Sequence, residues 1–341
     1  MRAVPMSRLI MSRWIMPRWI KHALAALLVS GAIAAVAPAP PARAETITIG
    51  LVGAVSATHW PIYVGLKQGF YAAKDIQLAT VFTLSSNALV QQLAAGSLDA
   101  ALSTGIVDPV YAIDKGAPIA VLRLEMVSPP YALLAKPAIP SIKALKGKTI
   151  MVDGPKGITR LYVERMLAAN GMKPGDVETL FAGATAARFS ALSAGAIDAT
   201  ILLPPFNFFA ESAGFRTLGL TVDYTPELPF TGAVVNRNWA MTHRPTLDRL
   251  IAVHNQSMAW FLDPRNREPA IALMVEATRQ RPEDVAKAYD FLQSRNFFDA
   301  SGQVSRTKMN AMLAALRELG DISPQLDVDR LILPGVTQVT E

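Results

Sequence analysis

Two eight-residue stretches, "LAAGSLDA" (residues 93–100) and "LSAGAIDA" (residues 192–199), are nearly the same although they lie 99 residues apart. In each, the leucine fits the buried face of a helix, and the glycine fits a helix C-cap because it tolerates a left-handed backbone. The aspartate, Asp99 or Asp198, then opens a buried strand. The repeat predicts two topologically similar α/β lobes, with both aspartates in structural roles.

Short apolar runs alternate with helical patterns on either side of these octets, which is typical of parallel βαβ units. The first half predicts strands at 46–52, 76–83, 99–104 and 119–127 and helices at 63–74, 87–96 and 107–116. The second half predicts strands at 148–154, 177–183, 198–204, 216–222 and 231–237 and helices at 159–171, 185–195 and 206–214. Amphipathic helices at 245–263, 281–294 and 305–320 follow, and we expect this block, without strand partners of its own, to pack on a lobe already built.

The N-terminus predicts an export signal that is cleaved after Ala44. A basic region precedes the apolar run at 23–37, and Ala42 and Ala44 supply the small residues that a signal peptidase requires. A retained membrane anchor is the alternative, but a run of 15 residues is shorter than the roughly 20 needed to span a bilayer. With no cysteine for lipidation or a disulfide, the chain is expected in a periplasm as a monomer.

The net charge of +6 belongs to this N-terminal segment. Residues 1–44 hold six Lys and Arg and no acid, and removing these six from the total of 33 leaves 27, equal to the 27 Asp and Glu. A neutral body gives no support for a nucleic-acid partner. The sequence has no P-loop and no G-x-S-x-G elbow, and its histidines after residue 44 lack metal-ligand spacing, so neither metal nor cofactor nor catalytic residues are expected.

Several further motifs resemble one known family. They are "GLKQGFYAAKDIQL" (65–78), "LKGKTIMVDGPKG" (145–157), "LAANGMKPGDV" (167–177), "VVNRNWAMTHRP" (234–245) and "FFDASGQV" (297–304). With the two octets, they are similar to the substrate-binding proteins of ABC importers in the nitrate/sulfonate/taurine branch, a superfamily that includes thiamine-pyrimidine synthase-like proteins. The resemblance implies a type II periplasmic-binding-protein fold in which two Rossmann-like lobes, 45–127 with 235–341 and 128–234, are joined by a two-strand hinge around a ligand cleft.

Ligands of open parallel sheets lie beyond the carboxyl ends of the strands, which points to six loops. These are "SATHWP", "SSN" and "TGI" in the first lobe and "DGPKGIT", "GATAAR" and "PPFN" in the second. The candidate ligand-binding residues from these loops are His59, Trp60, Ser85, Ser86, Thr104, Gly105, Lys156, Gly157, Thr159, Thr185, Arg188, Pro205 and Phe206. For each serine and threonine among them, the alternative to ligand binding is that the hydroxyl caps the N-terminus of a helix.

The first turns of these helices are interpreted as free of acids, although helix N-termini usually favour them. With Lys156 and Arg188 nearby, this predicts a small organic anion, sulfonate- or carboxylate-like. Trp60 and Phe206, if they face each other across the cleft, would favour an organic solute, aromatic or not, over nitrate, whereas His254 fits the core. Arg188→Ala is expected to weaken binding and to leave the stability of the ligand-free protein nearly unchanged.

The function predicted is capture of this solute and its delivery to an ABC permease and ATPase in the inner membrane. A binding protein for a pyrimidine-type thiamine precursor and a ligand sensor without a transport role are alternatives that share the cleft. A synthase-like enzyme is a further alternative, but the cysteine-rich cluster that marks those enzymes is missing from this sequence.

Overall fold

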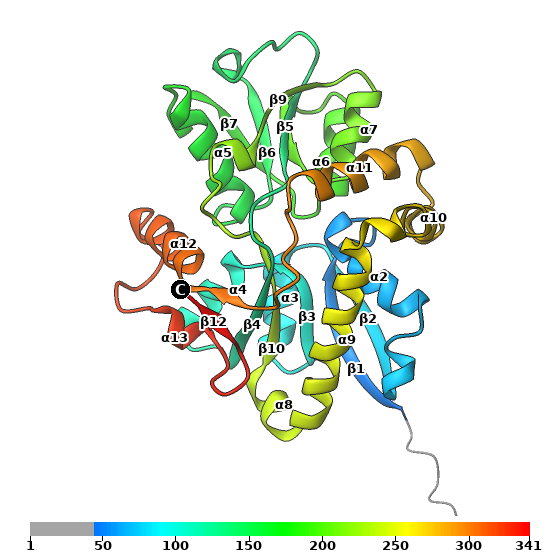
Figure 1. Cartoon of the computed structure of the whole chain (residues 1–341). Helices are drawn as coiled ribbons and strands as arrows, with labels where there is room; N and C mark the ends of the chain where they lie inside the picture. Colours follow the sequence, from blue (N-terminus) through cyan, green and yellow to red (C-terminus); the bar gives the residue numbers. More distant parts are fainter. Residues whose placement is uncertain (1–43) are drawn as a thin grey trace, which may run out of the picture. The chain divides into compact units, whose positions relative to one another are not determined.

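The computed structural model describes residues 44–341, which form one unit built around two five-stranded sheets (Figure 1). The predicted export signal, residues 1–44, falls outside the described residues except for Ala44. Within residues 44–341, no helix combines the length and the apolar character that a membrane crossing requires.

The two sheets have the same strand pattern. The first has the order β2-β1-β3-β10-β4 and contains β1 (Glu45–Val52), β2 (Ile76–Thr83), β3 (Ala100–Gly105), β4 (Ile119–Met126) and β10 (Thr231–Asn236). The second has the order β7-β6-β8-β5-β9 and contains β5 (Ala132–Ala135), β6 (Thr149–Val152), β7 (Glu178–Phe181), β8 (Ala199–Leu202) and β9 (Arg216–Leu220). In each sheet the fourth strand, β10 or β5, runs antiparallel to both neighbours. We call the two halves the first and the second lobe.

The two octets adopt one conformation in both lobes. Gly96 and Gly195 have φ angles of 77° and 74°, so each helix ends on a left-handed glycine as predicted. Asp99 Oδ2 accepts a hydrogen bond from the Thr48 amide at 2.7 Å, and Asp198 Oδ2 accepts one from the Thr149 amide at 3.1 Å. Each aspartate therefore joins the start of a central strand to its neighbour, far from the carboxyl ends of the strands.

This shared role gives a paired prediction. Asp99→Ala and Asp198→Ala should each lower the free energy of unfolding by about 1–2 kcal/mol, because each leaves a strand amide without its acceptor. Urea denaturation of residues 45–341 measures both. A loss below about 0.5 kcal/mol in either variant would contradict a structural role, as would a changed ligand affinity.

Helices cover both faces of each sheet. They are α2 (Trp60–Lys67), α3 (Ser86–Ala94), α4 (Val107–Asp114), α5 (Ile158–Ala169), α6 (Thr185–Ser193), α7 (Phe206–Ser212), α8 (Arg237–Thr242), α9 (Arg244–Leu262), α10 (Arg267–Thr278), α11 (Pro282–Ser294), α12 (Arg306–Glu318) and α13 (Val328–Leu331). The predicted helix at 63–74 is broken: α2 ends at Lys67, Gly69 has a φ of 72°, and only a 3-10 turn, Ala72–Lys74, follows. The sequence analysis did not predict β5, because an apolar run of four residues is too short to show the alternation of a strand or the periodicity of a helix.

The C-terminal block packs on both lobes. In Figure 1, α9 lies along the first lobe, where it packs against α2, while α11 reaches α7 of the second lobe. Ring centroids of Phe291 in α11 and Phe208 in α7 are 5.8 Å apart. The expectation that this block has no strand partners is wrong, because β11 (Val304–Ser305) pairs with β12 (Val339–Thr340) and Ile332 bridges to Val121 of β4.

Two chain segments cross between the lobes, one after β4 and one before β10. They are hydrogen-bonded to each other: the Thr221 amide donates to Tyr131 O at 2.9 Å, and the Phe230 amide donates to Met126 O at 2.9 Å. The rings of Tyr131 and Phe230 pack edge to face with centroids 5.0 Å apart. This pair of segments is the predicted two-strand connection, and it forms the base of the space between the lobes.

Candidate ligand-binding site

The carboxyl ends of the parallel strands in both sheets meet around a cavity of about 590 Å³. All six loops predicted from the sequence contribute to its wall, together with Tyr131 and Phe230 from the crossing segments. The lining residues are spread over the segments 52–59, 85–87, 103–108, 153–158, 183–188 and 203–206, in which some side chains point elsewhere. A volume of several hundred Å³ is the size range of pockets for small organic ligands.

The lobes touch each other at the rim of this cavity. The Ala57 amide of the first lobe donates a hydrogen bond to Pro204 O of the second at 3.1 Å. A Cβ added to Gly183 would lie 2.4 Å from Leu84 O and 2.8 Å from Ser85 Cβ, across the gap between lobes. A side chain at position 183 would therefore hold the lobes apart, so glycine is required for this closed arrangement.

Nine of the predicted ligand-binding residues line the cavity. They are His59, Ser85, Ser86, Gly105, Lys156, Gly157, Thr185, Arg188 and Phe206. The hydroxyl of Ser85 caps α3 by accepting from the Ala88 amide at 3.2 Å, so its N-cap role coexists with a place in the wall.

Four of the predicted residues do not line it. Trp60 is fully buried in the first lobe, where its ring meets Phe261 edge to face at 6.3 Å. Thr104 is buried with its hydroxyl 3.3 Å from Ser86 Oγ, and Thr159 is buried with its hydroxyl donating to Asp153 Oδ1 at 2.7 Å. Pro205 is also outside the wall and occupies the position directly before α7. α2 begins at Trp60, and this register turns the indole into the core.

The guanidinium of Arg188 is committed to the fold of the second lobe. Arg188 is only 1% exposed. It donates to the carbonyl oxygens of Ile201 at 3.1 Å, Ala182 at 3.1 Å and Gly183 at 2.5 Å, and to the Thr185 hydroxyl at 3.1 Å. Four of its five N–H groups are thus used, and one edge of the side chain reaches the cavity.

Lys156 directs its ammonium away from the cavity. The ammonium pairs with the carboxylate of Asp321, and it lies 5.8 Å from the centre of the Tyr111 ring. Tyr111 also donates a hydrogen bond to Asp321 at 3.1 Å. These contacts join the loop before α5 in the second lobe to α4 and the C-terminal block, and so reinforce the closed arrangement.

Two carboxylates that the sequence analysis did not name also line the cavity. Asp108 lies in the first turn of α4, so the interpretation that these helix starts are free of acids is wrong. Burial raises the pKa of Asp108 to about 6, a hydrogen bond with Ser86 lowers it, and the nearby charge of Asp153 raises it. The signal was in the sequence, because Asp108 follows the third strand of the first lobe by three residues and Asp153 directly follows β6.

Beneath the cavity floor lies a buried polar chain in the first lobe. Ser103, which lines the cavity with an unusual φ of 56°, donates a hydrogen bond to Glu125, and Glu125 Oε1 lies 2.7 Å from His254 Nε2. Glu125 and His254 are almost fully buried, which confirms that His254 is a core histidine. Burial lowers the pKa of His59, at the other side of this floor, to about 4, so its ring is neutral at pH 7.

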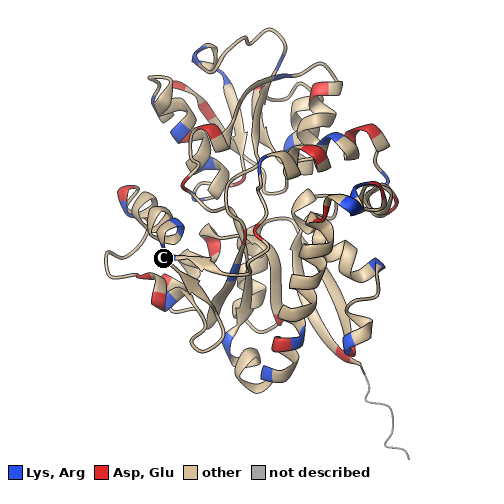
Figure 2. Ribbon diagram, viewed as in Figure 1, with Lys and Arg blue, Asp and Glu red and all other residues tan. Residues whose placement is uncertain are grey.

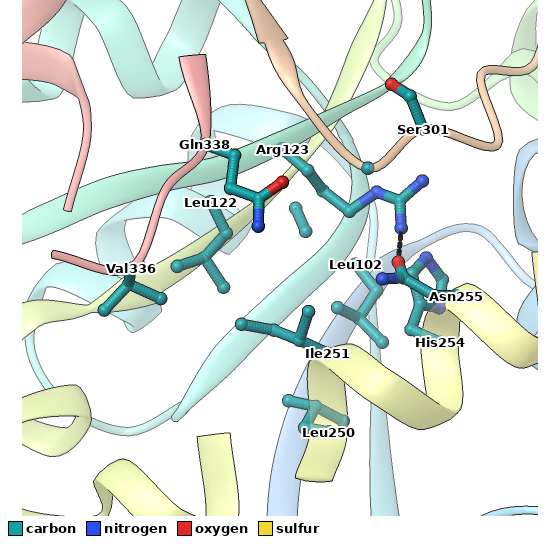
Figure 3. A pocket seen from close by; sticks show the side chains of 12 residues that line it. Leu102, Leu122, Arg123, Leu250, Ile251, His254, Asn255, Ser301, Val336 and Gln338 are labelled. Atoms are coloured by element: carbon teal, nitrogen blue, oxygen red, sulfur yellow. Dashed lines mark hydrogen bonds between the residues drawn. The ribbon is translucent and has the colours of Figure 1, made fainter. Parts of the chain in front are cut away.

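The far end of this chain opens onto a second, smaller cavity between α9 and the first sheet (Figure 3). Its volume is about 80 Å³, and its lining includes the buried Arg123 and His254 and the half-buried Asn255, to which Arg123 donates a hydrogen bond. Water occupies about 30 Å³ per molecule in the liquid, so this space suits a few waters rather than an organic solute. The cleft between the lobes is the candidate site.

The lobes carry charges of both signs. Figure 2 shows basic and acidic residues interspersed over the helices of both lobes. Among residues 44–341, no group of three or more His, Asp or Glu side chains is placed to hold a metal ion.

Two similar α/β lobes, crossed twice by the chain and closed around a cavity at their strand ends, define the periplasmic-binding-protein fold. The chain belongs to the NMT1/THI5-like family, whose model matches residues 56–266. Comparison with curated protein sequences gives no match.

Solved structures with this fold include binding proteins and an enzyme. The ligand-binding component of an ABC-type import system from Staphylococcus aureus, solved with zinc bound, has a TM-score of 0.72 at 15% identity over 86% of this chain and 97% of that one. The alkanesulfonate-binding protein of Xanthomonas axonopodis pv. citri, bound to MOPS, gives 0.69 at 19% identity over 88% and 100%. The desulfurization enzyme DSZB has a TM-score of 0.63 at 14% identity over 86% of this chain and 97% of that one.

Proposed function

We propose that this protein is the solute-binding component of an ABC importer. The observation that carries the proposal is the cavity of about 590 Å³ that both lobes enclose with their strand-to-helix loops. Hinged binders close around a ligand in such a cleft and present the closed form to their partner. The partners proposed are a permease and its ATPase, and the protein acts as a monomer in the periplasm after cleavage behind Ala44.

The solute proposed is a small organic molecule with an anionic group, sulfonate- or carboxylate-like. Two helices, α3 and α6, start at the cavity wall without an acid in their first turns. Helix N-termini favour anions through their free N–H groups and the helix dipole. Arg188 and the hydroxyls of Ser86 and Thr185 add donors on the two facing sides. Phe206 supplies an apolar surface for the body of the solute.

A thermal-shift panel tests this function. Residues 45–341 are mixed with alkyl and aryl sulfonates, aromatic carboxylates, nitrate and pyrimidines. A compound present at a hundred times its Kd should stabilise the protein by about 2.7 kcal/mol and raise the Tm clearly. We expect an organic sulfonate or carboxylate to do so. A rise with nitrate alone, or with no member of the panel, would contradict the proposal.

Gly183→Ala provides a matched test of closure. The added methyl group meets Leu84 and Ser85 of the other lobe, so the affinity for the panel's best compound should fall at least tenfold. Gly175→Ala adds the same methyl group to the second lobe where no atom lies within 4 Å, and should leave the affinity unchanged. Equal affinities for both variants would show that ligand binding does not need the lobes to meet.

A further inference from the structure

Ser103 has a backbone conformation that is unusual for a residue with a side chain. Its φ of 56° lies in the left-handed region, where the Cβ atom of an L-residue crowds the following carbonyl oxygen. Asp75, Arg279 and Asn296 share this feature, but each follows a helical segment, whereas Ser103 lies within β3 and lines the cavity. A disfavoured backbone conformation in the wall of a site persists only where neighbouring groups hold it.

The strand pairing around Ser103 brings it to a buried carboxylate. β10 lies between β3 and β4 and pairs antiparallel with both. Opposite β10, β3 carries one extra residue at Leu102–Ser103, and β4 carries Glu125 as an extra residue. Such bulges turn side chains out of the regular alternation of a strand. Here they allow the Ser103 hydroxyl to donate a hydrogen bond to Glu125 Oε2 across the strand between them.

Glu125 is itself held from the side away from the cavity. Its carboxylate is fully buried, and its other oxygen, Oε1, lies 2.7 Å from His254 Nε2 in α9. The charges of His254 and Arg123 keep the pKa of Glu125 below its usual value, so Glu125 accepts the Ser103 hydrogen bond as an ion. A hydrogen bond to an ionised acceptor is stronger than one between neutral groups. Glu125, His254 and Arg123 all lie outside the cavity wall.

The residues that follow Ser103 are tied to the cavity wall. The Thr104 hydroxyl lies 3.3 Å from the hydroxyl of Ser86, which lines the cavity. The Ile106 amide donates a hydrogen bond at 3.0 Å to the carbonyl oxygen of Phe230, which also lines the cavity. A change of φ at position 103 would swing this segment away from both partners, so the wall of the first lobe depends on the conformation of Ser103.

We propose that Glu125 is a positioning residue for the ligand site, because its hydrogen bond holds Ser103 in the left-handed conformation and so places the end of β3 at the cavity wall. The inference rests on the proposed function and deepens it by assigning a role to a residue that does not touch the solute. The Ser103 hydroxyl is engaged by Glu125 and is therefore not a donor to the solute. A direct contact between this hydroxyl and the solute, or a role in stability alone, gives different results in the tests below.

Two substitutions at position 103 test the proposal on residues 45–341 by titration calorimetry. Ser103→Ala and Ser103→Gly remove the same hydroxyl and deprive Glu125 of the same donor, but only glycine adopts a positive φ freely. The probe is whichever of butane-1-sulfonate, benzenesulfonate and benzoate raises the Tm of wild type most. We expect its Kd to rise about tenfold or more in Ser103→Ala and by less than about threefold in Ser103→Gly. Equal losses in both variants, or no loss in Ser103→Ala, would overturn the proposal.

Substitutions of Glu125 form the second arm. Glu125→Ala removes the acceptor and should raise the Kd about tenfold or more when Ser103 is present, but less than about threefold in the Ser103→Gly background, where glycine keeps the conformation without the bond. Glu125→Gln retains an oxygen that accepts from Ser103, and should keep the Kd within about threefold although the protein is less stable. A Kd raised equally in Glu125→Gln and Glu125→Ala would mark Glu125 as structural and overturn the proposal. If Glu125→Ala does not fold, the two variants at position 103 decide.

Amide hydrogen exchange of the ligand-free protein gives a readout that needs no solute. Relative to the amides of β8, those of residues 104–106 should exchange about tenfold faster or more in Ser103→Ala than in wild type, and within about threefold of wild type in Ser103→Gly. If none of the three probes binds to wild type, the proposed class of solute fails, and these rates alone decide whether Glu125 positions Ser103. Equal rates in the two variants would contradict it.

Discussion

Replacing Arg188 with alanine is expected to lower the free energy of unfolding of the ligand-free protein by about 3–5 kcal/mol. The guanidinium is the hydrogen-bond donor for the carbonyl oxygens of Ala182, Gly183 and Ile201, and it is 1% exposed. Without it the buried oxygen of Ile201 and the partly buried oxygens of Ala182 and Gly183 lose this donor, and the loop between β7 and α6 loses its tie to β8. This replaces the expectation from sequence that the ligand-free stability would be nearly unchanged.

Urea denaturation of residues 45–341 measures this loss, with Arg160→Ala as the matched control. Arg160 also belongs to the second lobe, but its guanidinium is exposed and pairs with Glu164 one helical turn away, so its removal should cost less than about 0.5 kcal/mol. A loss below 1 kcal/mol in Arg188→Ala would contradict the structural role. The affinity for the solute should also fall, because the loop that carries Thr185 forms part of the cavity wall.

Glu125→Gln is expected to lower the free energy of unfolding by about 3 kcal/mol at pH 7. The carboxylate is fully buried between Ser103 and His254, with Arg123 close by. Burial alone would raise the pKa of Glu125, but the charge and hydrogen bond of His254, the charge of Arg123 and the hydrogen bond of Ser103 hold it below its usual value. Removing the charge leaves the buried guanidinium of Arg123 without its counter-charge.

The pH dependence of this effect has a definite sign. A carboxyl group whose pKa is lowered in the folded protein stabilises it above the pKa of the unfolded chain, and this stabilisation is lost as the pH falls through the folded value. The difference between wild type and Glu125→Gln should therefore be full at pH 7 and shrink below about pH 4.5. Glu276→Gln, at an exposed pair with Lys67, should change the stability by less than about 0.5 kcal/mol. A constant difference from pH 7 to pH 3 would contradict the account.

The sequence predicted the fold well because the conformation of the repeated octets is determined by the residues within them. Local rules are enough to place these residues. A glycine suits the left-handed end of a helix, a leucine before it suits the buried helix face, and an aspartate after it suits the start of the next strand. The strand β5 and the early end of α2 depend on tertiary pairing and on one left-handed glycine, Gly69, so periodicity could not place them.

The candidate site was only partly predictable. Strand ends identified the correct loops, since every parallel strand of a sheet presents its carboxyl end on the same side. This rule identifies loops but does not predict the direction of each side chain. His59 lines the cavity, whereas its neighbour Trp60 is in the core. Asp153 lies in one of the identified loops and Asp108 lies in the first turn of the helix that follows another, so their positions after strand ends were the available signal for both acids.

The most direct test of the account is a crystal structure of residues 45–341 grown with the panel compound that raises the Tm most. We predict that the compound lies between the lobes, within hydrogen-bond distance of Ser86 in one and Thr185 in the other. A compound bound to one lobe alone, or held in the small cavity beside α9 while the cleft is empty, would contradict the claim that the two sheet ends form one binding site.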